Sequence, residues 1–238
     1  MTDLIYQTDA YLKEFSARVV SQIEGGVVLD RTAFYPGGGG QPYDTGLLRS
    51  EDGRTRQVTR MKRAQGQPVH VLDGDDLPAV GDAVEGALDW DRRYQLMRTH
   101  TAMHVLCGVI WRDYGASVTG GNMEPLKGRM DFEFETMRAE LVGAIEDAVN
   151  REVSAARPVT VDILPREEAF QIPDLIRTKI NLLPEGIAEV RVVEIEGLDL
   201  QADGGTHVAN TREIGPMRIV DYKSKGRINK RIYVEIGV

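Results

Sequence analysis

Two histidines spaced four residues apart, His100 and His104, are residues whose type and spacing could do chemistry. On an α-helix, side chains four positions apart lie on the same face, with Cβ atoms about 6 Å apart. Two imidazoles so placed can bind one divalent metal ion, as in the HExxH metalloproteases. The intervening residues are Thr101, Ala102 and Met103, so the glutamate that serves those proteases as general base is missing. The pattern indicates a metal site and excludes that class of protease.

A second motif offers two further candidate ligands. The segment Asp203-Gly-Gly-Thr-His207 is a glycine turn that carries an aspartate and a histidine four residues apart. The chain has only four histidines, and the two short motifs hold three of them. This concentration favours a metal site over a pair of histidines on a half-buried helix. The fourth, His70, lies in an alternating, strand-like run, and we expect it to be structural.

The histidine pair requires a helix, which we expect over residues 91–114. Asp89 or Asp91 can cap its start, and Gly115 stands where a left-handed residue would end it. Apolar and semi-apolar residues recur there with the three- and four-residue spacing of an amphipathic helix, at Met97, His100, Met103, His104, Cys107, Ile110, Trp111 and Tyr114.

The segments on either side of that helix differ in character. Residues 1–88 consist of short β-like runs separated by Gly, Asp and Pro, so we expect a β domain over 1–89 and a second domain over 90–238. In the second domain, helices are expected over 136–156 and from Arg166, with a glycine-rich turn at Gly120 and Gly121. This mixture predicts an α+β fold. Its expected strands cover 129–134, 158–164, 189–195, 218–222 and 231–237.

Four consecutive glycines, Gly37, Gly38, Gly39 and Gly40, stand out in the first domain. Glycine loses more conformational entropy on folding than any other residue, so a run of four needs a reason. Bulky and rigid residues flank the run, unlike the flanks of a flexible Gly/Ser linker. We weigh a flexible loop against a bare backbone surface that lines a pocket for a small group. The Lys-Ser/Thr of a phosphate-binding P-loop does not follow.

Composition narrows the class of protein. The 238 residues are 42% hydrophobic, which is enough for a packed core. The single cysteine excludes an intrachain disulfide and fits a reducing compartment. No apolar run reaches membrane-spanning length and no signal-peptide core is evident, so we expect a cytoplasmic protein without a membrane partner. The net charge of −8 argues against indiscriminate nucleic-acid binding.

One local basic segment remains, from Tyr222 to Arg231, with five basic residues and no acidic one. It is either a solvated hairpin edge that resists aggregation or a loop that contacts phosphates. In the second case Lys223, Lys225 and Arg227 would bind the substrate.

Taken together, these motifs resemble the AlaX family of free-standing alanyl-tRNA editing proteins and the related editing domain of alanyl-tRNA synthetase. The resemblance rests on TAFYPGGGGQPYDTG from Thr32, on DWDRRYQLMRTH and HTAMH around His100, on VRVVEI, and on GGTHVANTREIG after Asp203. The glycine-rich N-terminal domain is similar to that of the medium-length AlaX-M class. The resemblance implies a small β-barrel-like domain followed by an α+β editing domain. It also implies hydrolysis of mischarged tRNA(Ala), chiefly the seryl form, with the glycyl form as a second candidate.

The resemblance further implies one zinc ion per chain, held by two helix histidines and by the Cys and His of a CGGTH motif. Those positions are His100, His104, Asp203 and His207, so aspartate replaces the expected cysteine. Its oxygen can ligate zinc at about 2.0–2.2 Å, or it can orient a ligand while water completes a three-histidine site. Cys107, one helical turn after His104, is a third alternative. The harder donor set should admit other divalent metals more readily.

Selectivity must rest on a hydrogen bond, because any pocket that admits serine also admits the smaller alanine. The resemblance places Thr32, the glycine run and Gln41 beside the editing pocket, with the Thr32 hydroxyl as the candidate group. Thr206, next to a ligand, could contact the ribose or the water. Two other functions stay open: a metal-dependent hydrolase of another small ester or amide, and a non-catalytic tRNA-binding module with a structural zinc.

Overall fold

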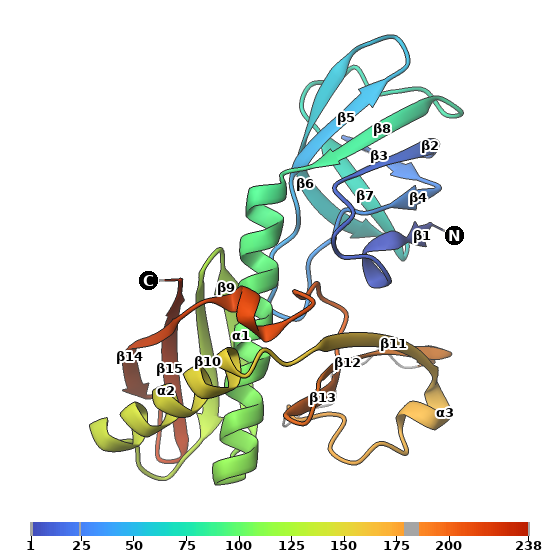
Figure 1. The fold of residues 1–238 in the computed structure, drawn as a ribbon. Coiled ribbons are helices and arrows are strands. Elements are labelled where there is room, and N and C mark those ends of the chain that lie inside the picture. Colours follow the sequence, from blue (N-terminus) through green and yellow to red (C-terminus); the bar gives the residue numbers. More distant parts are fainter. Residues whose placement is uncertain (1, 24, 179–185, 238) are drawn as a thin grey trace. The chain divides into compact units, whose positions relative to one another are not determined.

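The computed structural model describes residues 2–23, 25–178 and 186–237. The chain divides into two compact units, Met1–Tyr94 and Gln95–Val238. The boundary between them lies inside helix α1, slightly later than the position expected near residue 89. Strands dominate the described part, together with three α-helices, so the expected mixture of helices and strands is confirmed (Figure 1). The helices are α1 (Trp90–Tyr114), α2 (Ala139–Ser154) and α3 (Arg166–Ala169).

Six antiparallel strands of the first unit close into a barrel in the order β2-β3-β7-β6-β5-β8. Alternate residues of β2 point into the barrel, which gives this strand its regular exchange of buried and exposed positions. A separate parallel pair is formed by β1 (Asp3–Leu4) and β4 (Arg31–Thr32). The barrel strands are β2 (Glu14–Ile23), β3 (Gly26–Leu29), β5 (Gly46–Ser50), β6 (Thr55–Ala64), β7 (Gln67–Leu72) and β8 (Ala83–Leu88).

The glycine run in this unit is an ordered turn. Gly37, Gly38, Gly39 and Gly40 have φ angles of 85°, 138°, 57° and 90°, values that residues with a Cβ rarely adopt. Gly38 and Gln41 exchange two backbone hydrogen bonds, of 3.1 and 2.9 Å. The backbone conformation of the turn thus gives a physical reason for the four glycines.

A buried ion pair anchors the end of the glycine motif. The side chains of Arg93 and Asp44 are 0% and 1% exposed and contact each other directly. The Asp44 carboxylate also accepts the backbone N–H of Tyr35 at 2.6 Å, and the Arg93 guanidinium donates to the carbonyls of Ala10 and Ala33 at 2.9 and 2.5 Å. A buried charge needs this degree of pairing and hydrogen bonding. The pair therefore holds the two ends of the motif together around its turn.

The second unit contains two antiparallel sheets, with orders β14-β15-β10-β9 and β11-β12-β13. The predicted turn at Gly120 and Gly121 is wrong, because both residues pair with β10 as part of the edge strand β9. The ladder of backbone hydrogen bonds outweighs the low strand propensity of glycine there. The first sheet comprises β9 (Val118–Glu124), β10 (Lys127–Glu133), β14 (Met217–Ser224) and β15 (Asn229–Ile236), and the second β11 (Val159–Pro165), β12 (Glu189–Ile195) and β13 (Asp199–Ala202).

Helix α1 forms the buried centre of the second unit. Its capping is as predicted: Asp89 Oδ1 accepts the N–H of Arg92 at 3.3 Å, and Gly115, with φ 63°, follows its last residue. The helix is buried on almost all sides, which is typical of a core helix rather than a surface helix. Its residues with exposure of 2% or less include Leu96, Met97, Ala102, Met103, Val105, Leu106, Val109 and Ile110.

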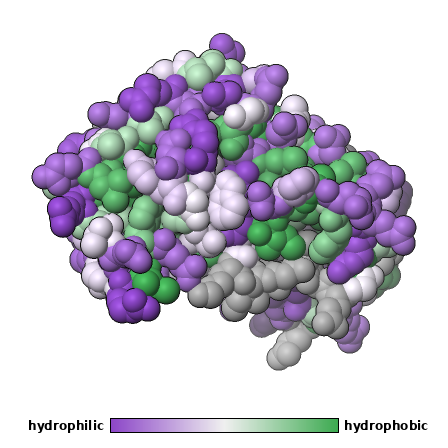
Figure 2. Space-filling model, turned by 90° about the horizontal axis from the view of Figure 1, so that it is seen from below, coloured by the Kyte–Doolittle hydropathy of each residue, from purple (hydrophilic) through white to green (hydrophobic). Residues whose placement is uncertain are grey.

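The surface bears both hydrophilic and hydrophobic side chains. On the face drawn in Figure 2, hydrophilic residues cover much of the area and hydrophobic ones appear between them. Across the described ranges, no helix combines the length and the apolar character that a membrane crossing requires.

Candidate metal centre

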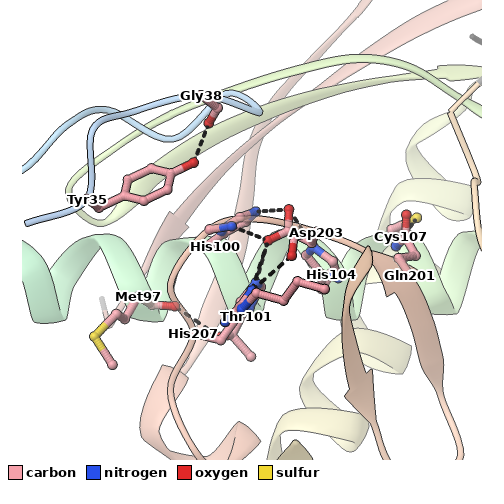
Figure 3. A network of polar contacts seen from close by, with 12 residues as sticks. Tyr35, Gly38, Met97, His100, Thr101, His104, Cys107, Gln201, Asp203 and His207 are labelled. Carbon is pink, nitrogen blue, oxygen red and sulfur yellow. Dashed lines mark hydrogen bonds and ion pairs between the residues drawn. The ribbon is translucent and has the colours of Figure 1, made fainter. Parts of the chain in front are cut away.

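Four side chains of the second unit converge on one point. One ligand atom from each of His100, His104, Asp203 and His207 lies within 4.8 Å of every other (Figure 3). The Asp203 carboxylate oxygens lie 3.5 Å from His100 Nε2, 3.9 Å from His104 Nε2 and 3.1 Å from His207 Nε2. Four donors about 2.1 Å from one tetrahedral metal ion would be roughly 3.4 Å apart. The spacing fits a single divalent ion.

Two elements supply these side chains. Helix α1 provides His100 and His104 from one face, as their spacing predicted. The turn that follows β13 provides Asp203 and His207, and backbone contacts hold it in place. The N–H of Gly205 donates to Asp203 Oδ2 at 2.6 Å, and the Arg191 guanidinium donates to the Asp203 carbonyl at 2.9 Å.

The outer nitrogens of two histidines have their own partners. His104 Nδ1 lies 2.9 Å from Asp199 Oδ2, and because an ionised carboxylate only accepts hydrogen bonds, this nitrogen carries the proton. The Thr101 hydroxyl donates to the Met97 carbonyl at 3.0 Å, so its oxygen accepts from His207 Nδ1 at 3.3 Å. In a neutral imidazole the other nitrogen is then an acceptor. Both Nε2 lone pairs consequently face the centre of the cluster.

Burial and the neighbouring charges shift the pKa values of all four side chains, and they favour the neutral imidazole at His100 and His207 and the ionised carboxylate at Asp203. Burial lowers the pKa of His100 to about 4, against the raising effect of Asp203. Burial, with the nearby His100, also lowers the pKa of His207 well below its usual range. For His104, burial is outweighed by the hydrogen bond and charge of Asp199, and its pKa is raised. Burial alone would raise the pKa of Asp203, but the three histidines hold it well below its usual range.

The cluster therefore combines inward-facing imidazole lone pairs with an ionised carboxylate in a buried space. Electron-pair donors so close together repel one another unless a cation lies between them. A set of three nitrogens and one oxygen is one that divalent transition metals accept. The residues fit a metal ion, and Asp203 faces the same centre as the histidines.

Two other residues of this unit that the sequence analysis considered, Thr206 and Cys107, lie outside the group of four. Thr206 is fully buried beside His207, and its backbone makes a hydrogen bond with His100. Cys107 lies outside the group of four, with its sulfur 3.4 Å from Gln201 Nε2. Burial raises the pKa of its thiol to about 12, which disfavours the thiolate that a metal would need.

Thr32 lies in the first unit and is fully buried. Its Oγ1 is 2.8 Å from His70 Nε2 and accepts the N–H of Phe34 at 3.1 Å. His70 Nδ1 faces the Val27 carbonyl at 3.2 Å, so it must donate there and leave Nε2 as an acceptor. The Thr32 hydroxyl proton therefore points to His70. His70 has a structural partner, as expected, whereas the selectivity role of Thr32 stays a prediction.

The basic segment forms the turn between β14 and β15 and the strand ends beside it. Lys223 pairs with Asp221 at 2.9 Å, and Arg231 pairs with Asp131 at 2.6 Å. Lys230 donates to two carbonyls of the turn and is buried. No ion pair within the described ranges involves Lys225 or Arg227, both of which are exposed.

Comparison with known proteins places the chain in a family. A model described as "tRNA synthetases class II (A)" matches residues 5–92, and one described as "Threonyl and Alanyl tRNA synthetase second additional domain" matches residues 190–233. "Alanyl-tRNA editing protein AlaX-M" of Saccharolobus solfataricus is 41% identical over 240 residues, which cover 99% of each chain. The chain belongs to the AlaX-M family.

Further relatives agree with this assignment. The AlaX-M protein of Methanosarcina barkeri is 40% identical over 238 residues, or 98% of each chain. An "Alanine--tRNA ligase" of Sulfurisphaera tokodaii is 37% identical over 223 residues, which cover 92% of this chain and 24% of the ligase. The resemblance to the AlaX-M class found in the motifs is confirmed. In this chain, Asp203 stands where the CGGTH motif expected from the family resemblance has a cysteine.

The role of Asp203 leads to a first prediction. Asp203→Ala should weaken metal binding by at least about tenfold, since even partners outside the ligand shell typically contribute 10–100-fold. Asp203→Cys should retain a working site because thiolate is also a zinc ligand. Elemental analysis and competition with a chromophoric chelator measure both variants.

The matched control is Asp162→Ala, which removes an exposed aspartate from β11. It should bind metal like the unaltered protein. If the Asp203→Ala variant also kept its full affinity, Asp203 would be a turn residue and not a ligand.

Proposed function

We propose that this protein is a trans-editing hydrolase that deacylates mischarged tRNA(Ala), with seryl-tRNA(Ala) as its main substrate and glycyl-tRNA(Ala) as a second. The observation that carries the proposal is the convergence of three imidazole nitrogens and a carboxylate in a member of the AlaX-M family. One zinc ion per chain is the proposed cofactor, held by His100, His104, Asp203 and His207. A reducing, cytoplasmic setting fits the single buried thiol.

The chemistry asks little of the protein, because an aminoacyl ester is already activated. It needs a positioned water, a polarised carbonyl and stabilisation of the developing oxyanion. A bound divalent ion supplies a Lewis acid for these tasks and a point on which the terminal ribose can be oriented. Thr206, buried directly beside His207, would contact the ribose or the water. Cys107 does not act as a nucleophile in this scheme, since burial raises the pKa of its thiol to about 12.

A deacylation assay tests the proposal. The purified protein should hydrolyse seryl-tRNA(Ala) and spare alanyl-tRNA(Ala), lose this activity when a chelator removes the metal, and regain it when zinc is added. Retention of tRNA binding without hydrolysis would instead identify a non-catalytic module. Chelator-sensitive hydrolysis of simple amino-acid esters, with seryl-tRNA left intact, would indicate a hydrolase of another small ester.

We assign tRNA contact to the turn between β14 and β15. Lys225 and Arg227 are exposed, and Tyr222 nearby is 37% exposed, so cations and an aromatic ring are available to an RNA strand. We expect Lys223 to contribute less to tRNA binding than Lys225 and Arg227, because it already pairs with Asp221.

This assignment predicts a change in salt dependence. The double substitution Lys225→Gln with Arg227→Gln should raise KM for aminoacyl-tRNA more than it lowers kcat. It should also reduce the slope of log affinity against log salt by about 2, because two phosphate contacts are lost. Arg138→Gln with Arg151→Gln, an equal charge change at exposed positions before and within α2, should leave the slope unaltered. Equal slopes for both double variants would identify the turn as a solvated edge.

Selectivity for serine is assigned to Thr32, with the glycine turn Gly37–Gly40 and Gln41 bringing bare backbone to the small side chain. The Thr32 proton points to His70 and one lone pair of its oxygen accepts the N–H of Phe34, so the second lone pair is the one assigned to the serine hydroxyl. Alanine has no hydroxyl to donate. A buried acceptor left without its donor penalises the wrong substrate.

Thr32→Val, which is nearly isosteric and lacks the hydroxyl, should lower the serine-to-alanine ratio of kcat/KM by about tenfold to a hundredfold. Thr32→Ser keeps the hydroxyl and should largely keep the ratio. Thermal unfolding of both variants reports the loss of the bond to His70 separately. An unaltered ratio in a folded Thr32→Val protein would restrict this hydroxyl to a role inside the barrel.

A further inference from the structure

Asp199, at the start of β13, is a buried carboxylate that neither sequence motif includes. Its side chain is 0% exposed. One oxygen, Oδ2, lies 2.9 Å from His104 Nδ1 and accepts a hydrogen bond from Gln201 Nε2 at 2.8 Å. The other, Oδ1, lies 2.6 Å from Arg177 Nη1. Within the described residues, Oδ2 is hydrogen-bonded, whereas Oδ1 makes no hydrogen bond and is balanced by the charge of the adjacent guanidinium.

The Arg177 guanidinium lies between the Asp199 carboxylate and the Trp111 ring. Its side chain is 11% exposed, and its guanidinium carbon lies 5.6 Å from the centre of the Trp111 ring, within the range of a cation–π interaction. The guanidinium balances the negative charge of Asp199 and occupies Oδ1. Asp199 is therefore held toward His104 and away from the centre of the cluster.

The close approach of Asp199 to α1 depends on a glycine in the helix. Gly108 lies one turn after His104, on the side that faces β13. A Cβ at this position would lie 2.9 Å from Leu198 Cγ, 3.1 Å from the Leu198 carbonyl oxygen and 3.2 Å from Asp199 Cβ. Glycine in a helix interior costs roughly 1 kcal/mol relative to alanine. Glycine at this position lets β13, which carries Asp199, pack closely against α1.

We propose that Asp199 is a positioning residue for the metal centre: it holds the proton of His104 on Nδ1 and so directs the Nε2 lone pair at the metal, while Arg177 fixes Asp199 in place. The inference rests on the proposed metal site and adds the residues that orient its ligand. A carboxylate behind a ligating histidine fixes the ring and its tautomer and makes it a better donor. Gln201 supplies a second donor to the same carboxylate oxygen.

Asp199→Asn tests the proposal on metal binding alone. The amide can present its NH₂ group to Nδ1 and favour the tautomer whose proton blocks Nε2. We expect the dissociation constant for zinc, measured by competition with a chromophoric chelator, to rise about 10–100-fold. The matched control is Asp113→Asn, which removes an aspartate that also pairs with an arginine, Arg112, and touches none of the histidines. Its affinity should be unchanged.

A second measurement needs no variant. In the zinc-loaded protein, ¹⁵N–¹H correlation spectra of the imidazoles should show His104 protonated at Nδ1 and metal-bound through Nε2. Ligation of His104 through Nδ1 would overturn the proposal, as would a folded Asp199→Asn protein with unchanged zinc affinity.

These outcomes are separate from those of the proposed function. The chelator competition and the spectra do not depend on deacylation. If the unaltered protein binds zinc with His104 arranged as described but does not hydrolyse seryl-tRNA, the proposed substrate fails and the role of Asp199 stands. If hydrolysis is found and Asp199→Asn keeps its zinc affinity, the proposed function stands and the role of Asp199 fails.

Discussion

The second unit is built around four electron-pair donors that face each other in a buried space. The Asp203 carboxylate lies 3.1–3.9 Å from the Nε2 atoms of three imidazoles, and donors so close together repel one another unless positive charge is placed between them. Their outer contacts preserve this condition: Asp199 and Thr101 hold protons on the outward nitrogens of His104 and His207. The surrounding core, with α1 at its centre, thus holds together four donors that fit a metal ion.

The four clustered side chains could be predicted from the sequence because they lie in short motifs. Four-residue spacing on a helix brings His100 and His104 to one face whatever the rest of the fold does, and glycines around Asp203 and His207 mark a tight turn. Asp199 could not be found in the same way. Its position beside His104 depends on β13 approaching α1 at Gly108, and on Arg177 reaching the same point from a distant part of the chain. Nothing in local spacing encodes either contact.

The fold shows the same division between local and long-range information. Helix α1 and its end residues Asp89 and Gly115 follow local rules and were predicted correctly. The strand at Gly120 and Gly121 was not, because its hydrogen bonds come from β10 and not from its own propensity. The glycine run was ambiguous for a related reason. Its order depends on positive φ angles and on the distant Arg93–Asp44 pair, neither of which a run of glycines reveals.

The presence of an aspartate rather than a cysteine at position 203 affects how readily this cluster is oxidised. Reactive oxygen species attack thiolates, which pass through sulfenic acid to irreversibly oxidised forms, whereas a carboxylate has no such steps. The chain's single sulfhydryl, Cys107, is buried, and burial raises its pKa to about 12. Peroxide therefore finds no thiolate among the four donors and almost none elsewhere. An aspartate in place of a cysteine leaves a donor set that oxidants cannot dismantle through sulfur.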